Sequence, residues 1–115
     1  MTDSAGCLFC KIVAGEIPAD IVRSTDDTVA FRDIAPEAPT HVLVIPRTHH
    51  VDVAQLAASD PDLAGRLVVD AAAVAAELGV VDFRMVLNTG ASAGQSVFHV
   101  HAHVMAGRPF TWPPG

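Results

Sequence analysis

Three histidines at a spacing of two, His99, His101 and His103, are the residues whose types and arrangement could do chemistry. A β-strand rises about 3.3 Å per residue and its alternate side chains share a face, so the rings would stand in a row with roughly 6.6 Å between neighbours. Such a row could carry nucleophilic or acid–base chemistry, hold a metal, or be a solvated polar face. Because that spacing is too wide for all three rings to bind one ion without distortion, divided roles are favoured.

The loop before this row, residues 89–96, favours a phosphate ligand. Gly90 and Gly94 allow backbone amides to approach a ligand closely, and Gln95 and Ser96 add a side-chain amide and a hydroxyl. The loop lacks the lysine of a Walker motif and the glycine spacing of a dinucleotide-binding motif. A flexible hairpin loop explains the glycines equally well.

Cys7 and Cys10, the only cysteines, form a second group. They could be half of a zinc site, a redox dithiol or two small buried hydrophobes. No βαβ pattern of the thioredoxin kind surrounds them, which disfavours redox use. His49, His50 and His99 are the histidines that could complete a closed Cys₂His₂ zinc site.

A small α+β domain must position these groups. Apolar runs and turn formers predict five strands, over residues 21–23, 28–32, 41–45, 83–88 and 97–105. The last two strands are most simply joined as an antiparallel hairpin. A short helix is predicted over residues 8–14. The longest helix is predicted to begin near Ser59 as its N-cap, with Pro61 and Asp62 in its first turn, and to end at Gly79.

The composition limits the classes of protein that the chain can be. Its 115 residues suit a single domain over residues 1–115. With 50% hydrophobic residues, only 17% charged residues and a mean hydropathy of +0.38, a subunit interface is predicted, most simply in a homodimer. The net charge of −6 and the single lysine, Lys11, disfavour a nucleic-acid partner.

Two ends of the chain carry further expectations. Residues 1–6 have no targeting pattern, and no charge-free run reaches about 18 residues, so a cytoplasmic protein without a membrane partner is expected. The tail, residues 106–115, holds three prolines and the only tryptophan, Trp112, and is expected to be irregular and to dock. Trp112 could equally cover an apolar patch of its own subunit. Asp33 and Asn88, at strand ends, could belong to a site or be ordinary turn residues.

The segment His99-Val100-His101-Ala102-His103-Val104-Met105 resembles the His-φ-His-φ-His-φ-φ signature of the histidine triad (HIT) superfamily, where φ is an apolar residue. The surroundings resemble the Hint branch of that superfamily in particular. The likeness runs almost end to end, through Phe9-Cys10-Lys11-Ile12, Gly15-Glu16-Ile17-Pro18-Ala19, Ala30-Phe31, Asp33-Ile34, Ala38-Pro39-Thr40-His41, Leu43-Val44-Ile45-Pro46, Arg84-Met85-Val86, Gly94-Gln95-Ser96-Val97 and Trp112-Pro113-Pro114-Gly115.

The resemblance implies a fold and an activity. The fold is α+β, a five-stranded antiparallel sheet with one long helix and a short N-terminal helix, which dimerises into a ten-stranded sheet. The activity is that of a nucleotide phosphoramidase or nucleotidyl hydrolase, which cleaves the P–N bond of purine nucleoside 5′-monophosphate derivatives, of AMP or GMP, through a covalent nucleotidyl-histidine. The alternative is a catalytically weak, nucleotide-binding regulatory or scaffold dimer.

The resemblance also implies roles for individual residues. His101 would be the nucleophile, His103 would contact the phosphate oxygens, Ser96 would assist the leaving amine, and His41 would share their pocket. Gly94, Gln95, the Val97 amide and Asn88 would surround the phosphate, and Asp33 would bind the ribose. The base slot would be formed by Leu8, Phe9, Ile12, Phe31 and Ile34. Trp112, in a tail docked at the dimer interface, would reach the partner's active site. A structural zinc ion would be held by Cys7, Cys10, His49 and His99, with His50 as an alternative to His49.

Overall fold

A five-stranded antiparallel sheet, ordered β1-β2-β3-β5-β4, is the frame of the molecule. The structure, a computed structural model, describes residues 5–115, so the expectation of no targeting segment falls partly outside the described residues. The strands are β1 (Ile21–Ser24), β2 (Thr28–Arg32), β3 (Thr40–Pro46), β4 (Arg84–Val86) and β5 (Ala102–Ala106). β4 and β5 pair antiparallel, as the sequence predicts.

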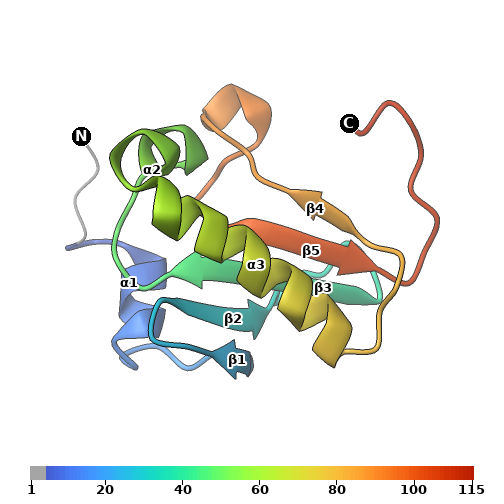
Figure 1. Cartoon of the computed structure of the whole chain (residues 1–115), viewed down its shortest axis with the longest axis horizontal. Coiled ribbons are helices and arrows are strands. Elements are labelled where there is room, and N and C mark those ends of the chain that lie inside the picture. The colour runs from blue at the N-terminus through green and yellow to red at the C-terminus, as the bar shows by residue number, and fades with distance from the viewer. Residues whose placement is uncertain (1–4) are drawn as a thin grey trace.

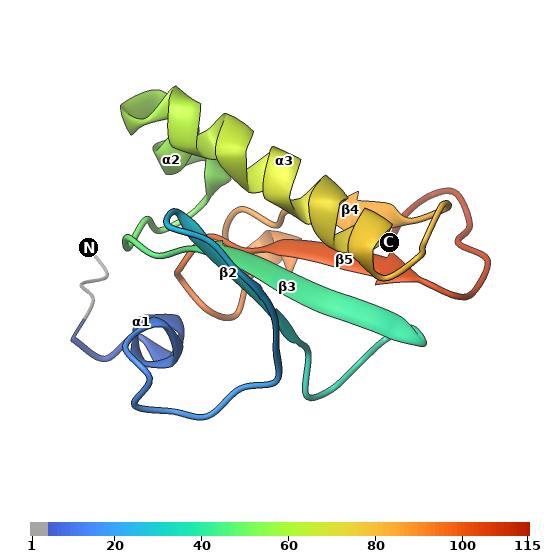
Figure 2. The same ribbon diagram turned by 60° about the horizontal axis from the view of Figure 1, so that its bottom comes forward.

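Helices cover both faces of this sheet. They are α1 (Leu8–Val13), α2 (Val53–Ser59) and α3 (Pro61–Glu77), and a single 3₁₀ turn (Ala91–Ala93) lies in the loop before β5. Figures 1 and 2 show α2 and α3 on one side of the sheet and α1 on the other. The α+β fold class is therefore confirmed. Among residues 5–115, no helix is long and apolar enough to cross a membrane.

Along residues 99–104, successive side chains point to opposite faces of the sheet, and each face packs against a different cluster of buried residues. Val100, Ala102 and Val104 are buried in the core beneath α3. The histidines that alternate with them, His99, His101 and His103, must therefore face the α1 side of the sheet. There Phe9 of α1 packs edge-on against the rings of His99 and His101, with centroid distances of 5.9 and 5.1 Å. Alternation thus delivers the three imidazoles to one side, as the sequence predicts.

The strand that carries the histidines is shorter than the predicted range of residues 97–105. β5 pairs with β3 only from Ala102 onward, opposite Val44. Before that point the Val100 amide donates to the carbonyl of His50 at 2.8 Å, away from the ladder. His99 and His101 therefore lie in the segment that enters the strand, and only His103 lies within it. β4 is likewise shorter than the predicted 83–88.

The predicted start of the long helix is also wrong by one residue, and a helix was missed. Asp60, not Ser59, caps α3, because its Oδ1 accepts the Leu63 amide at 3.1 Å. Ser59 is the last residue of α2, which begins after its own cap, Asp52. α2 has seven residues and buries only Leu56, so it shows no repeating apolar stripe that a sequence pattern could reveal.

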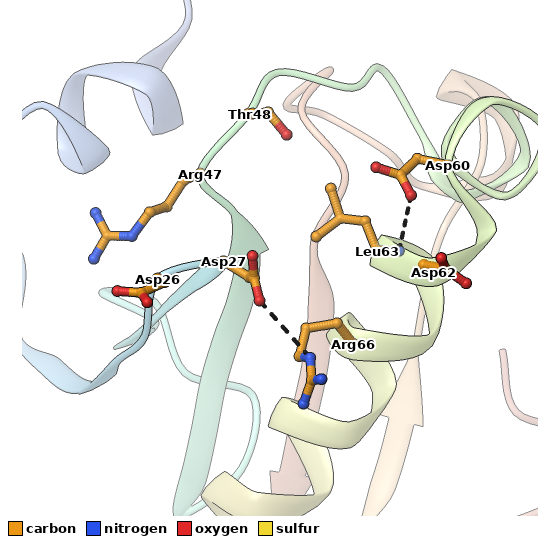
Figure 3. A pocket seen from close by; sticks show the side chains of 8 residues that line it. All are labelled: Asp26, Asp27, Arg47, Thr48, Asp60, Asp62, Leu63 and Arg66. Atoms are coloured by element: carbon orange, nitrogen blue, oxygen red, sulfur yellow. Dashed lines mark hydrogen bonds and ion pairs between the residues drawn. The ribbon is translucent and has the colours of Figure 1, made fainter.

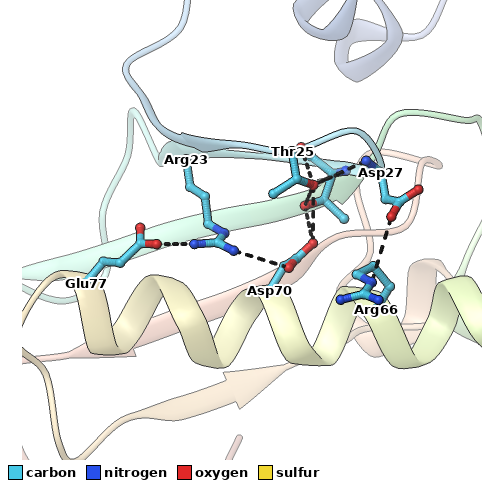
Figure 4. Close-up of polar contacts among 7 residues, drawn as sticks. Arg23, Thr25, Asp27, Arg66, Asp70 and Glu77 are labelled. Carbon is cyan, nitrogen blue, oxygen red and sulfur yellow. Dashed lines mark hydrogen bonds and ion pairs between the residues drawn. The ribbon is translucent and has the colours of Figure 1, made fainter.

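A buried carboxylate ties the β1–β2 hairpin to α3 (Figure 4). Asp70, which is 2% exposed, accepts a hydrogen bond from the Thr28 hydroxyl at 2.6 Å. It also forms an ion pair with Arg23 at 3.6 Å, and Arg23 pairs in turn with Glu77. Because a buried carboxylate needs such partners, this network fixes the hairpin that leads into Phe31 and Asp33.

Candidate active site

Three histidines from β3 and the β5 segment, His41, His101 and His103, lie side by side, and the last two line one cavity. The β3–β5 register pairs Leu43 with His103 and His41 with Met105, so His41 and His103 are diagonal neighbours on adjacent strands. Their ring centroids are 5.2 Å apart, and those of His101 and His103 are 5.0 Å apart. The His101 and His103 rings stand closer together than the roughly 6.6 Å that alternate residues of an ideal strand would give.

His101 is held in one tautomer. Its Nδ1 lies 2.8 Å from the carbonyl oxygen of His99, which can only accept, so Nδ1 carries the proton. The lone pair is then at Nε2. Burial lowers the pKa of His101, against the opposing effects of the His99 carbonyl and of the Asp33 carboxylate. The ring is therefore neutral at pH 7, as a nucleophile must be.

His41 and His103 form a directional pair. The Glu37 amide donates to Nδ1 of His41 at 3.0 Å, which leaves the His41 proton on Nε2. That nitrogen lies 2.9 Å from Nδ1 of His103, so His41 donates and His103 keeps its own proton on Nε2. Burial, followed by the neighbouring His101 and His41, lowers the pKa of His103 to about 4. His103 is thus a neutral ring with a donor available to a ligand.

The hydrogen bond from the Glu37 amide to His41 argues against a metal site at Asp33, His41 and His103. Ligand atoms of Asp33, His41 and His103 all lie within 4.8 Å of one another. Asp33 Oδ2 is 3.5 Å from Nε2 of His41. However, the amide that donates to Nδ1 of His41 keeps Nε2 protonated, and a protonated nitrogen has no lone pair for an ion. The cluster therefore fits a hydrogen-bond relay and not a metal centre.

An apolar cavity of about 280 Å³ opens beside these rings. It is lined by ten residues to which the sequence assigns a role, namely Leu8, Phe9, Ile12, Phe31, Asp33, Ile34, Ser96, Val97, His101 and His103. Sequence reasoning missed Ile17, Pro18, Ala19, Arg32 and Leu43, which also line it. The alternation of β3 could have found Leu43, which lies two residues after His41. Ile17, Pro18 and Ala19 depend on how the chain between α1 and β1 folds back, and Arg32 is the last residue of β2.

Three other expected residues, Asn88, Gly94 and Gln95, do not line this cavity. A Cβ atom on Gly94 would lie 3.6 Å from Nδ2 of Asn88, so this glycine lies against the Asn88 side chain. Gly94 also has a φ of 102°, a conformation that suits glycine. Gln95 is buried in the loop. In contrast, the Ser96 and Val97 amides donate no hydrogen bond to the residues that the structure describes.

The tail leaves Trp112 away from the cavity of its own chain. The guanidinium groups of Arg84 and Arg108 both lie over the Phe110 ring, with their Cζ atoms 5.0 and 4.3 Å from the ring centre. The Arg84 side chain also donates to the carbonyl of Thr111 at 3.0 Å. These contacts anchor the irregular tail, while Trp112 remains 84% exposed.

Cys7, Cys10, His49 and His99 come together in a second cluster. Nδ1 of His99 lies 3.4 Å from Sγ of Cys7 and 3.5 Å from Sγ of Cys10, and Nδ1 of His49 lies 3.4 Å from Sγ of Cys10. Tetrahedral zinc, with bonds of about 2.3 Å to sulfur and 2.0–2.1 Å to nitrogen, would separate sulfur from nitrogen by about 3.5 Å. The four donors therefore fit a tetrahedral metal ion.

The tautomer of His99 supports the same conclusion. Its Nε2 lies 2.8 Å from the carbonyl of Pro46, so the proton is there and the lone pair of Nδ1 faces the two thiols. Burial, and then the neighbouring Cys7, raises the pKa of the Cys10 thiol to about 11. His50 instead contacts Thr48 and Gln55, so His49 is the one of the two that lies in the cluster.

A separate hollow of about 370 Å³ lies at the start of α3 and shares no residue with the histidine cluster (Figure 3). Four of its six charged side chains already have partners. Arg66 pairs with Asp27 at 3.8 Å, Asp60 caps the Leu63 amide, and Arg47 donates to the carbonyl of Thr25. This hollow is best explained as a solvated junction between the β1–β2 turn and the helix.

Comparison with known proteins gives the family. The model of the HIT domain matches residues 14–110. The chain belongs to the histidine triad family. This HIT protein is 50% identical over 112 residues to an uncharacterized HIT-like protein of Synechocystis, covering 94% of this chain and 96% of that one. It is 41% identical over 104 residues to the purine nucleoside phosphoramidase of Escherichia coli K12, covering 89% and 87%.

Solved structures agree. The crystal structure of a HIT family hydrolase from Legionella pneumophila superimposes with a TM-score of 0.91 at 42% identity, covering 96% of this chain and all of that one. A histidine triad protein from Clostridium difficile superimposes with a TM-score of 0.89 at 35% identity, covering 96% and 97%. These matches confirm the predicted HIT fold.

Proposed function

We propose that this HIT protein hydrolyses purine nucleoside 5′-phosphoramidates and related nucleotidyl derivatives through a nucleotidyl intermediate on His101. The observation that carries the proposal is the hydrogen bond from Nδ1 of His101 to the His99 carbonyl, which leaves a neutral ring with its Nε2 lone pair at the cavity. Similarity to the purine nucleoside phosphoramidase of E. coli supports the same substrate class.

In the first step, Nε2 of His101 attacks the α-phosphorus and the P–N bond breaks. The imidazole becomes a cation, and the His99 carbonyl accepts a hydrogen bond from the proton that stays on Nδ1. The leaving nitrogen departs as an amine after it takes a proton from the hydroxyl of Ser96, which lines the cavity and regains a proton from solvent water. In the second step, a water molecule attacks the same phosphorus and gives one proton to solvent, the bond to His101 breaks and restores the neutral ring, and the nucleoside monophosphate leaves.

Charge on the phosphate is stabilised by donors of the chain. His103 presents its Nε2 proton, since Nδ1 accepts from His41, and the amides of Ser96 and Val97 are free to donate. Fixed donors of this kind supply most of the catalysis in phosphoryl transfer. Asp33 binds the ribose hydroxyls, and the apolar slot around Phe9 holds the base.

A structural zinc ion is part of the proposal. Cys7, Cys10, His49 and His99 would hold it, and its contribution is to brace the backbone of His99, whose carbonyl orients His101. It would not activate water, since four protein donors close the coordination sphere. A reducing cytoplasmic compartment also belongs to the proposal, because the thiols must stay reduced to bind the ion.

Two copies of the chain are proposed to pair through β4, the last strand of the sheet, to form ten strands. The high apolar content and the exposed side chains of Val81, Phe83 and Trp112 support this arrangement. The docked tail of one copy would then carry Trp112 toward the partner's active site.

The activity is tested by incubating the protein with adenosine 5′-phosphoramidate and following AMP release. Wild type should release AMP and His101→Ala should not. His50→Ala is the matched control, since His50 faces Thr48 and Gln55 outside the cavity, and it should keep wild-type rates. Binding of AMP without turnover of any phosphoramidate would instead support the nucleotide-binding regulatory dimer.

A further inference from the structure

Gln95 has its polar atoms fully engaged with the protein before any ligand binds. The side chain is 3% exposed. Its Oε1 accepts the Gly90 amide at 2.8 Å, and its Nε2 donates to the carbonyls of Val51 at 2.7 Å and Val97 at 3.1 Å. Both amide hydrogens and one oxygen lone pair are therefore used. This arrangement does not suit a side chain that contacts phosphate.

The loop around Gln95 needs an outside support. It contains two glycines with positive φ values, 89° at Gly90 and 102° at Gly94, which most other residues avoid. Glycine also has more conformational freedom in the unfolded chain, so ordering this loop costs more entropy. Within the described part of the chain, its backbone-to-backbone hydrogen bonds are local and run between residues 90 and 95. Among residues 5–115, the hydrogen bond from Gln95 to Val51 is the one that ties the loop to a different segment.

The segment that receives this bond also touches the rest of the site. His49 contributes a donor to the metal cluster, the His50 carbonyl accepts the Val100 amide at 2.8 Å, and the Val51 carbonyl accepts from Gln95. Three consecutive residues thus fix the metal cluster, the backbone beside His101 and the loop relative to one another.

We propose that Gln95 is a positioning residue: it fixes the loop of residues 90–97 through three backbone contacts, so that the Ser96 and Val97 amides stand ready beside His101. The inference rests on the proposed function and adds to it a residue that supports the site without contacting the phosphate. A misplacement of catalytic groups by about 1 Å can cost about 100-fold in rate, so this support matters for turnover.

The first test uses Gln95→Met, which is similar in length and lacks all three hydrogen bonds. In the ligand-free protein, amide hydrogen exchange at Gly90 should become at least tenfold faster, while amides of α3 and β5 keep wild-type exchange. With adenosine 5′-phosphoramidate, kcat should fall by about 10- to 100-fold with a smaller change in KM. The chain's other glutamine provides the control, and Gln55→Met should leave both measurements unchanged.

The second test uses Gln95→Glu, in which the new side chain has nearly the same size and shape as glutamine. A protonated carboxyl keeps one donor and one acceptor, whereas an ionised one cannot donate to the Val51 or Val97 carbonyl. The activity of Gln95→Glu relative to wild type should therefore fall as the pH rises through the titration of this carboxyl. Gln95→Met should show no such dependence. A purely structural defect would not follow the protonation of the introduced group.

Two results would overturn the inference. One is wild-type kcat together with wild-type Gly90 exchange in Gln95→Met. The other is unchanged Gly90 exchange in the ligand-free variant combined with weakened AMP binding, which would make Gln95 a direct phosphate contact. If wild type itself turns over no phosphoramidate, the proposed function fails, but the exchange measurement on the ligand-free proteins still decides the role of Gln95.

Discussion

Replacing His41 by leucine tests how the second imidazole of the site is held. In the wild type, the Glu37 amide fixes the proton of His41 on Nε2, and this proton is donated to Nδ1 of His103 at 2.9 Å. Without that donor, His103 is free to move its own proton to Nδ1. Its Nε2 would then present a lone pair to the phosphate, and a stabilising hydrogen bond would be lost.

The size of the effect follows from the bond that is lost. A hydrogen bond to a charged group contributes about 1.5–3 kcal/mol. At 1.36 kcal/mol for each factor of ten, kcat/KM for His41→Leu should fall by about 10- to 150-fold at pH 7. His41→Gln is the matched variant, because its amide nitrogen can still donate toward His103, and it should lose less activity.

The pH dependence makes this prediction specific. Protonation puts hydrogens on both nitrogens of His103 and restores the missing donor. The ratio of His41→Leu to wild-type kcat/KM should therefore rise as the pH falls toward the pKa of His103, which burial and neighbouring rings hold at about 4 in the wild type. Thermal melting of each variant controls for folding. Activity of the leucine variant within twofold of wild type, or a deficit that is the same at every pH, would refute the relay.

Three further results are expected. Wild-type kcat/KM should stay level from pH 8 to about 6.5 and fall only at lower pH, because burial lowers the pKa of His101 and only the neutral ring has a lone pair; a decline that begins above pH 7 would contradict this. Purified protein should bind about one equivalent of zinc by elemental analysis, and Cys10→Ser should lose the metal and melt at a lower temperature; equal zinc content in both would rule out the cluster. Asp70→Ala should lower the free energy of unfolding by about 2–3 kcal/mol in urea titrations, since the Thr28 hydroxyl and Arg23 lose their buried partner, and an unchanged midpoint would show that the network is not stabilising.

Local patterns in the sequence were sufficient for much of the frame. β-branched runs located β2 and β3, and the spacing of His101 and His103 placed both rings on one face. The cysteine pair with His99 indicated a metal cluster, and His49 was one of two histidines that could complete it. These features could be predicted because alternation along a strand and donor chemistry are properties of neighbouring residues.

Features that depend on distant segments could not be predicted. β5 begins at Ala102 because the preceding backbone bonds to His50 and not to β3. His50 lies about fifty residues earlier in the chain, so a local pattern does not reveal this contact. The tautomer of His41 depends on the Glu37 amide, which no side-chain pattern reveals. Gln95 looks like a ligand contact in the sequence, yet in the fold its amide is directed into the loop and toward Val51.

The central claim is that Nε2 of His101 bonds to phosphorus during turnover. The most direct measurement is intact-protein mass spectrometry after rapid acid quenching of the enzyme with an adenylated substrate, followed by mapping of the modified peptide. We expect a mass increase of one adenylyl group on His101, present in the wild type and in His50→Ala and absent from His101→Ala. Steady AMP release with no adduct at any quench time, or an adduct that persists in His101→Ala, would contradict the account.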